Sequence, residues 1–137
     1  MSYGGAAALQ DAVYQHLIAD IGLNTLVGGA IYDAVPGGVL PDTYVTLGPE
    51  EVRDRSDKTG AGAEHRFTVT VTTTLAGFAA AKEVATAISD ALVDANLTLS
   101  RGELVGLWFD RAVAVRSGTA GDTRTITLRF RARVDDT

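Results

Sequence analysis

Histidines are the side chains of this chain best suited to holding a metal ion or carrying a proton in catalysis. There are two, His16 and His65, and they lie far apart in the sequence. Neither belongs to an H-x-x-x-H or H-E-x-x-H pattern, which would place two ligands on one helical face. We interpret both as ordinary packing or surface residues, and we expect no catalytic residue and no metal site.

Acidic clusters and glycine pairs were the next candidates for chemistry. The acids of segment 50–62 lack the alternating spacing, central glycine and closing glutamate of a calcium-binding loop. The glycine pairs Gly4-Gly5, Gly28-Gly29 and Gly37-Gly38 are not followed by the Gly-Lys-Ser/Thr of a phosphate loop. The acids are typical of a solvated loop and the glycines of turns, so we expect no cofactor and no enzyme.

The composition excludes further classes of function. The chain has no cysteine, which excludes disulfides, thiolate catalysis and cysteine-based zinc sites. Its net charge of −5 disfavours tight binding to nucleic acid, because such proteins are usually basic. No apolar run approaches the roughly 18–20 residues of a membrane span, and the N-terminus has no secretion-signal pattern. We therefore expect a soluble protein with no membrane partner.

Two charged features point to a partner. Residues 49–62 carry seven charged side chains in fourteen residues, and we interpret them as a loop that is either an assembly arm or an idle linker. Three arginines alternate along one face of the last strand, where their like charges repel each other. Either solvent or an acidic surface of a neighbouring subunit would offset this repulsion. The candidate interface residues are Glu50, Glu51, Arg53, Asp54, Arg55, Asp57, Lys58, Arg129, Arg131 and Arg133.

Hydrophobic periodicity supplies the elements that would hold these side chains. Apolar residues at helical spacing predict helices over Ala6–Ile21 and Gly77–Asp94. We expect Gly22 to end the first helix, and Asn24 to cap a short turn before Gly28. Alternation or short apolar runs predict strands over Ile31–Val35, Tyr44–Leu47, Ala63–Thr74, Leu104–Val115 and Thr123–Val134, with a short strand or link at Leu97–Leu99.

Leu104–Val115 is apolar on both faces around Trp108, which is typical of a central strand buried on two sides. The turn at 117–122 should join it to the last strand as a hairpin. Strands grouped in runs between two helices favour an α+β fold, with a mixed, mostly antiparallel sheet and two main helices on one face. We expect one domain over residues 1–137, with the charged loop at 49–62.

The order of several short stretches resembles a known family. Ala8–Leu17 is followed by Leu26-Val27-Gly28-Gly29 and Ile31–Pro36, then by Leu40-Pro41 and Tyr44–Gly48. A charged loop, Glu64-His65, the alanine-rich Ala80–Ala85 and the closing Leu128–Arg133 come after these. In this order the chain resembles the DUF3168 family of small tail-completion proteins, which are found in long-tailed phages and gene transfer agents.

The resemblance implies a non-enzymatic tail terminator. Such a protein forms a hexameric ring on the tail tube, stops tube polymerisation and offers the head-neck complex a docking surface. Its implied partners are other copies of itself, the tail tube protein and a head-tail connector or neck protein. DNA would pass through the ring without specific binding, which the acidic net charge favours. Its implied place is the tail-neck junction of a virion or gene-transfer-agent particle that is assembled in the host cytoplasm.

Two alternatives remain at this level. One is another head-tail connector or neck adaptor, built from the same elements with a different neighbour. The other is a small oligomeric α+β enzyme or ligand-binding module, which predicts a pocket with polar groups around His65 and Trp108.

Overall fold

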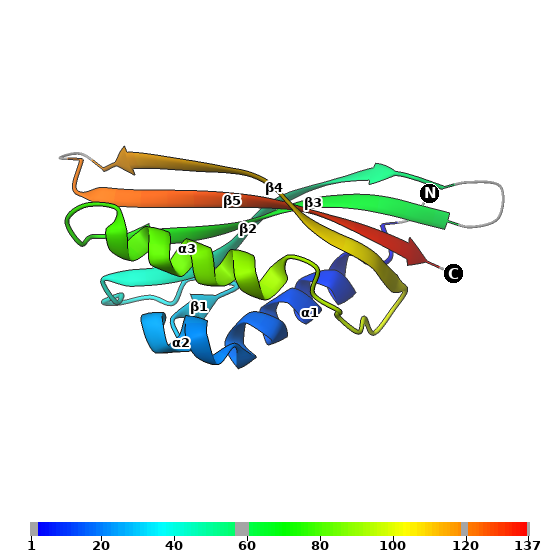
Figure 1. Ribbon diagram of the computed structural model, residues 1–137, viewed down its shortest axis with the longest axis horizontal. Coiled ribbons are helices and arrows are strands. Elements are labelled where there is room, and N and C mark those ends of the chain that lie inside the picture. Colours follow the sequence, from blue (N-terminus) through cyan, green and yellow to red (C-terminus); the bar gives the residue numbers. More distant parts are fainter. Residues whose placement is uncertain (1–2, 57–60, 119–120, 137) are drawn as a thin grey trace.

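The computed structural model describes residues 3–56, 61–118 and 121–136. Its helices are α1 (Ala6–Ala19), α2 (Ile21–Val27) and α3 (Ala79–Leu92). The strands are β1 (Ile31–Tyr32), β2 (Thr43–Asp54), β3 (Ala61–Thr73), β4 (Glu103–Ser117) and β5 (Thr123–Asp136). Figure 1 shows the long strands running side by side above the helices.

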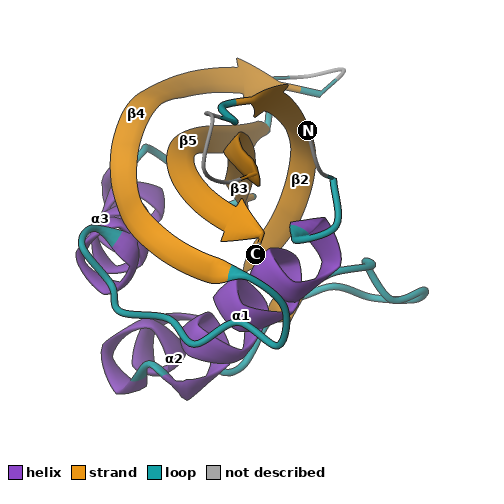
Figure 2. Ribbon diagram, turned by 90° about the vertical axis from the view of Figure 1, so that its right-hand side faces the viewer, coloured by secondary structure: helices purple, strands orange, loops and turns teal. Residues whose placement is uncertain are grey.

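The five strands form one sheet in the order β1-β2-β3-β5-β4. The short β1 pairs with β2 in parallel, and every other neighbouring pair is antiparallel. The sheet is strongly twisted, and the three helices of the described chain lie on one side of it (Figure 2). The predicted α+β fold with a mixed, mostly antiparallel sheet is therefore confirmed, with one more helix than expected.

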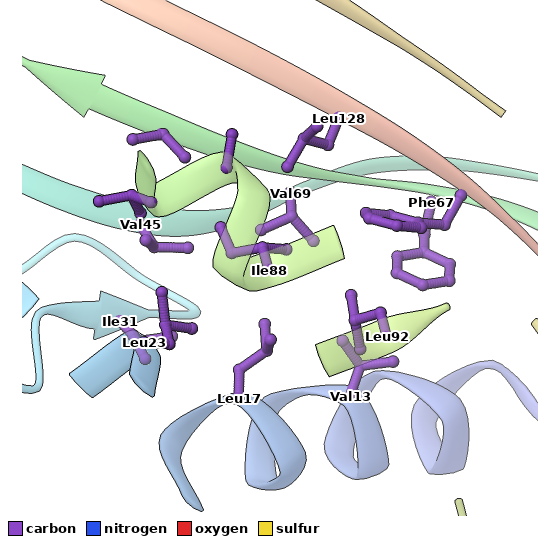
Figure 3. Close-up of a cluster of buried hydrophobic side chains, with 14 of the residues drawn as sticks. Val13, Leu17, Leu23, Ile31, Val45, Phe67, Val69, Ile88, Leu92 and Leu128 are labelled. Atoms are coloured by element: carbon purple, nitrogen blue, oxygen red, sulfur yellow. The ribbon is translucent and has the colours of Figure 1, made fainter. Parts of the chain in front are cut away.

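The core lies between the helices and one face of the sheet. The predicted stripe of the first helix is buried at Leu9, Val13 and Leu17, and the second long helix buries Ile88 and Leu92. These side chains meet alternate residues of β2, β3 and β5, as Figure 3 shows. Phe130, at the centre of β5, stacks on Phe67 with ring centroids 5.6 Å apart.

The region after α1 differs from the prediction. The first helix ends at Ala19 rather than Ile21, because the extended Asp20 accepts a hydrogen bond from the Leu23 backbone N–H (2.8 Å) and caps a second helix. Gly22, expected to end the first helix, lies inside α2, and the left-handed Gly28 (φ 60°) ends α2 instead. Asn24 donates to carbonyl oxygens of α1 and of Asp20 rather than capping a turn.

The predicted charged loop at 49–62 is largely strand, so that prediction was wrong. β2 continues to Asp54 and β3 begins at Ala61, and Glu50 to Asp54 pair with Phe67 to Ala63. Pro49 does not stop β2 because it lies at a shift of register between Leu47 and Glu50, where a missing N–H is tolerated. Only residues 55–60 connect the two strands.

The position of the Trp108 strand was also predicted wrongly. β4 is an edge strand that pairs only with β5 within the described chain, and every residue from Arg111 to Ser117 is exposed. Its apolar side chains therefore lack the cover that their pattern predicts. The expected hairpin between β4 and β5 is present, with Ser117 opposite Thr123.

One short predicted strand is reduced, and the stretch predicted as either a short strand or a link is a link. The strand expected over Ile31–Val35 is limited to Ile31–Tyr32, and Leu97–Leu99 is an extended link outside the sheet. Between β1 and β2, residues 33–42 form an irregular loop that is exposed over most of its length.

Candidate assembly surface

The face of the sheet away from the helices, called the outward face here, has two halves of different chemistry. Alternation places the polar side chains of β2, β3 and β5 on it, opposite the core. One half is uncharged, and its cross-strand neighbours are mostly threonines and valines: Thr46, Thr70, Thr72, Val113, Val115, Thr125 and Thr127. The other half, towards the β2–β3 hairpin, holds a network of charges.

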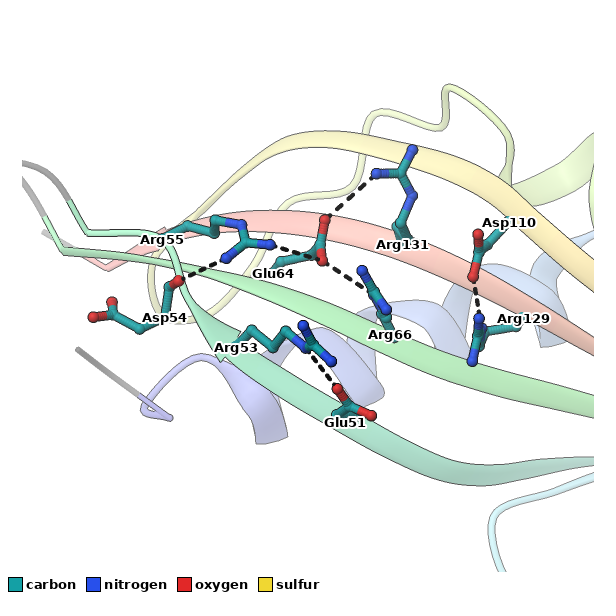
Figure 4. A network of polar contacts seen from close by, with 9 residues as sticks. All are labelled: Glu51, Arg53, Asp54, Arg55, Glu64, Arg66, Asp110, Arg129 and Arg131. Atoms are coloured by element: carbon teal, nitrogen blue, oxygen red, sulfur yellow. Dashed lines mark hydrogen bonds and ion pairs between the residues drawn. The ribbon is translucent and has the colours of Figure 1, made fainter.

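Glu64 is the centre of this network (Figure 4). Three guanidinium groups form ion pairs with its carboxylate. The distances from a guanidinium nitrogen to a carboxylate oxygen are 3.1 Å for Arg66, 3.4 Å for Arg131 and 3.7 Å for Arg55. The Glu64 side chain is 11% exposed, whereas the three arginines remain in partial contact with water. A nearly buried carboxylate needs such partners, because an unpaired charge out of water is costly.

The three alternating arginines are each paired within the chain. Arg129 Nε lies 2.6 Å from Asp110 Oδ2, and Arg133 Nε lies 3.1 Å from Asp135 Oδ1. Arg133 also donates to the Arg55 carbonyl oxygen (2.8 Å), which ties β5 to the end of β2. These arginines therefore do not need an acidic neighbouring subunit to balance their charge.

The remaining candidate residues of the hairpin are at its surface. Arg53 Nε contacts Glu51 Oε1 at 2.7 Å, and this pair lowers the pKa of Glu51 and raises the pKa of Arg53. The Ser56 hydroxyl and backbone N–H donate to Asp54, which lowers the pKa of that carboxyl. Asp57 and Lys58 lie outside the described residues.

Glu50 lies apart from the other candidates, on the helix side of the sheet. It accepts a hydrogen bond from the Tyr3 hydroxyl, which raises the pKa of Tyr3. Its carboxylate also lies 3.8 Å from Nδ1 of His65, a side chain that is 1% exposed and has no hydrogen-bond partner at Nδ1. Burial lowers the pKa of His65, and the nearby Glu50 opposes that shift in part.

The described residues contain no cluster of three or more histidines or acids that could hold a metal ion. His16 has a packing role, since its Nε2 donates to the Ala91 carbonyl oxygen at 2.8 Å and joins α1 to α3. No helix in the described ranges has the length and apolar character needed to cross a bilayer.

His65 and Trp108 cannot line one pocket, because they lie on opposite faces of the sheet. His65 is opposite Ala132 on the core face, whereas Trp108 is opposite Arg131 on the outward face. The Arg131 guanidinium lies 5.6 Å from the indole centroid. Trp108 packs over Gly106, where a Cβ would lie only 2.3 Å from the indole Cζ2.

Sequence reasoning brought together most of the charged side chains on the outward face but missed Glu64, Arg66 and Asp110. Glu64 and Arg66 were visible as the polar half of an alternating strand. The approach of Arg131 to Glu64 depends on the β3–β5 register, which brings together residues 67 positions apart and leaves no local signal. Asp110, which follows the core-facing Phe109, lies at a shift of register between Phe109 and Arg111 and accepts a hydrogen bond from Arg129.

Comparison with known proteins places this fold and surface in a family. None of the curated proteins matches the chain. Among solved structures, it is similar to a chain described as part of the virion of a native gene transfer agent particle. The two share 63% sequence identity and a TM-score of 0.93, over 98% of this chain and 99% of that chain. Residues 11–135 match the family described as tail completion protein gp17, and the chain belongs to that family.

Proposed function

We propose that this protein is a structural component of a phage-like tail, located at the tail-neck junction of a virion or gene-transfer-agent particle. The observation that carries this proposal is the near full-length likeness, at 63% identity, to a chain of a gene transfer agent particle. Membership of a tail-completion family supports the same role. A structural role, rather than catalysis, also agrees with a site built from mutually paired charges.

In finer detail, we propose that the protein forms a hexameric ring that caps the tail tube, ends tube polymerisation and joins the tail to the head-neck complex. A ring needs a heterologous contact, in which one patch of each copy meets a different patch of the next. The net charge of −5 supports passage of DNA through such a ring, because it disfavours phosphate binding.

The charged end of the β2–β3 hairpin is proposed as a rim of this contact. The charges of its described residues already have partners within the chain, so they would set the register between copies more than the affinity. Exchanging the pair, as Glu51→Arg with Arg53→Glu, keeps an ion pair within the chain and reverses the pattern that a neighbour meets. We expect the double variant to fold normally and to assemble more weakly; unchanged assembly would remove the hairpin from the interface.

The ring is tested by electron microscopy and light scattering of the purified protein, at several concentrations. We expect closed rings with a central hole and the mass of six copies. Added below stoichiometric amounts to polymerising tail tube protein, the wild-type chain should also shorten the tubes. A monomer at every concentration, with no effect on tube length, would overturn the proposal.

A further inference from the structure

A groove lies between α3 and the exposed half of the edge strand β4. Its volume is about 320 Å³, and it is lined by Lys82, Ala85, Thr86, Ser89, Ala112, Ala114, Ile126 and Leu128. The helix contributes residues three or four positions apart, which form one face, and the strand contributes two small alanines. Ala112 and Ala114 of the strand wall are exposed, whereas Ile126 and Leu128 of β5, at the floor, are almost fully buried.

The loop between β1 and β2 has the opposite shape. It projects from the molecule, and Val39 near its tip is fully exposed, with Val35 about half exposed. Residues 34–41 carry no charged side chain and include Pro36 and Pro41, which fix the backbone and lower the entropy lost on docking. An apolar, partly rigid projection of this kind has the character of an anchor for an apolar pocket.

The loop and the groove lie on opposite sides of the molecule. Figure 2 shows the loop that follows β1 projecting on the side away from α3 and β4. The charges beside them are also complementary. Asp33 and Asp42 are the first and last residues of the loop, whereas Lys82 lines the groove and Arg116 lies on the same face of β4 beyond Ala114. A closed ring of identical copies requires two different, complementary patches on each copy, and the loop and the groove supply such a pair.

We propose that the loop at residues 33–42 of one copy docks into the α3–β4 groove of the next copy, with Val39 as its apolar anchor. This inference rests on the proposed ring and names the contact that builds it. The docked loop would cover Ala112 and Ala114, the two exposed apolar residues on the groove side of the edge strand.

Cross-linking tests the contact directly, because the chain has no cysteine and each introduced thiol is unique. Val39→Cys and Ala112→Cys are prepared as separate proteins, mixed, and treated with a short bis-maleimide linker. We expect a covalent dimer that contains one copy of each. Val39→Cys mixed with Thr70→Cys, which lies on the outward face, is the matched control and should give little product.

Two substitutions on β4 give an independent test. Ala112→Trp fills the groove, whereas Val113→Trp places the same side chain on the opposite face, and both positions are exposed in the single chain. We expect Ala112→Trp and Val39→Asp to weaken association by about tenfold or more, and Val113→Trp to weaken it much less. Circular dichroism should show all three variants to be folded like the wild type.

The outcomes separate this contact from the ring itself. Rings without the Val39–Ala112 cross-link, or equal effects of the two tryptophan variants, would overturn the contact and leave the ring intact. Cross-linked open chains without rings would support the contact and overturn the ring. If neither rings nor cross-links are observed, both the contact and the ring are overturned.

Discussion

Removing the charge of Glu64 should destabilise the fold more than removing any exposed acid of the hairpin. Glu64→Gln keeps the shape of the side chain but leaves Arg66, Arg131 and Arg55 facing a neutral amide. One amide oxygen can still accept a hydrogen bond, whereas the amide NH₂ must lie next to guanidinium groups that are themselves donors only. The variant therefore loses charge-assisted hydrogen bonds and gains a conflict between donors.

The size of the stability loss in Glu64→Gln follows from how far the three arginines are exposed to water. Breaking a fully buried ion pair costs about 3–5 kcal/mol. Arg66, Arg131 and Arg55 are 26%, 40% and 45% exposed, so water can solvate them once the carboxylate is gone. The hydrogen bonds to a charged group then set the loss, at about 2 kcal/mol. For a chain of this size, that corresponds to a melting temperature lower by about 6–10 °C.

Urea and thermal unfolding followed by circular dichroism provide the assay. All variants are compared at one protein concentration, because association would raise the apparent stability of those that assemble. Glu51→Gln is the matched control: the same chemical change on the same face of the sheet, in a pair that is more than half exposed on both sides. Its unfolding should differ little from that of the wild type. Equal stability of Glu64→Gln and wild type would refute the reasoning, and so would equal losses in the two variants.

Three further predictions address the core and the sheet faces. Because burial lowers the pKa of His65 below its ordinary value near 6.5, the folded state binds fewer protons than the unfolded state, and stability should fall as pH drops below that value. His65→Phe should flatten this dependence in urea titrations between pH 5 and 7; an unchanged slope would contradict it. Ile88→Ala, at a fully buried site, should cost about 2–5 kcal/mol in the same assay, and a loss well below 1 kcal/mol would mean that the site collapses freely. Gly106→Ala should displace the indole of Trp108, the single tryptophan, and change its fluorescence emission; an identical spectrum would refute the close packing.

Local patterns were sufficient to predict the fold class and most of the core. Leu9, Val13 and Leu17 repeat at helical spacing, and the alternation of β5 separated its apolar residues from its arginines correctly. Both patterns report on the burial of residues near in sequence, which is why they could be read without a structure.

The hairpin of β2 and β3 could not be predicted because its cause is not local. Residues 49–55 are charged apart from Pro49 and Val52, and such a composition favours a loop. They form a strand because β3 supplies their hydrogen-bond partners and the arginines of β5 reach Glu64 and Arg55 from beyond β3. Tertiary contacts of this kind override local propensity.

For β4, the composition correctly predicted a strand, but it did not predict that the strand lies exposed at the edge of the sheet. Val113 and Val115 on one face, with Ala112 and Ala114 on the other, are typical of a strand covered on both sides. In the single chain these residues are exposed at the edge of the sheet. Exposed apolar edge strands promote aggregation, and soluble proteins usually protect them with charges, prolines or covering elements. From Ala112 to Val115, β4 has no charge and no proline, so its composition fits an assembled state in which a neighbouring copy supplies the cover. Under this reasoning, an assembly-blocked variant such as Val39→Asp should bind more of a hydrophobic dye than the ring does, because it leaves the α3–β4 groove open; equal dye binding by the two forms would show that the cover comes from elsewhere.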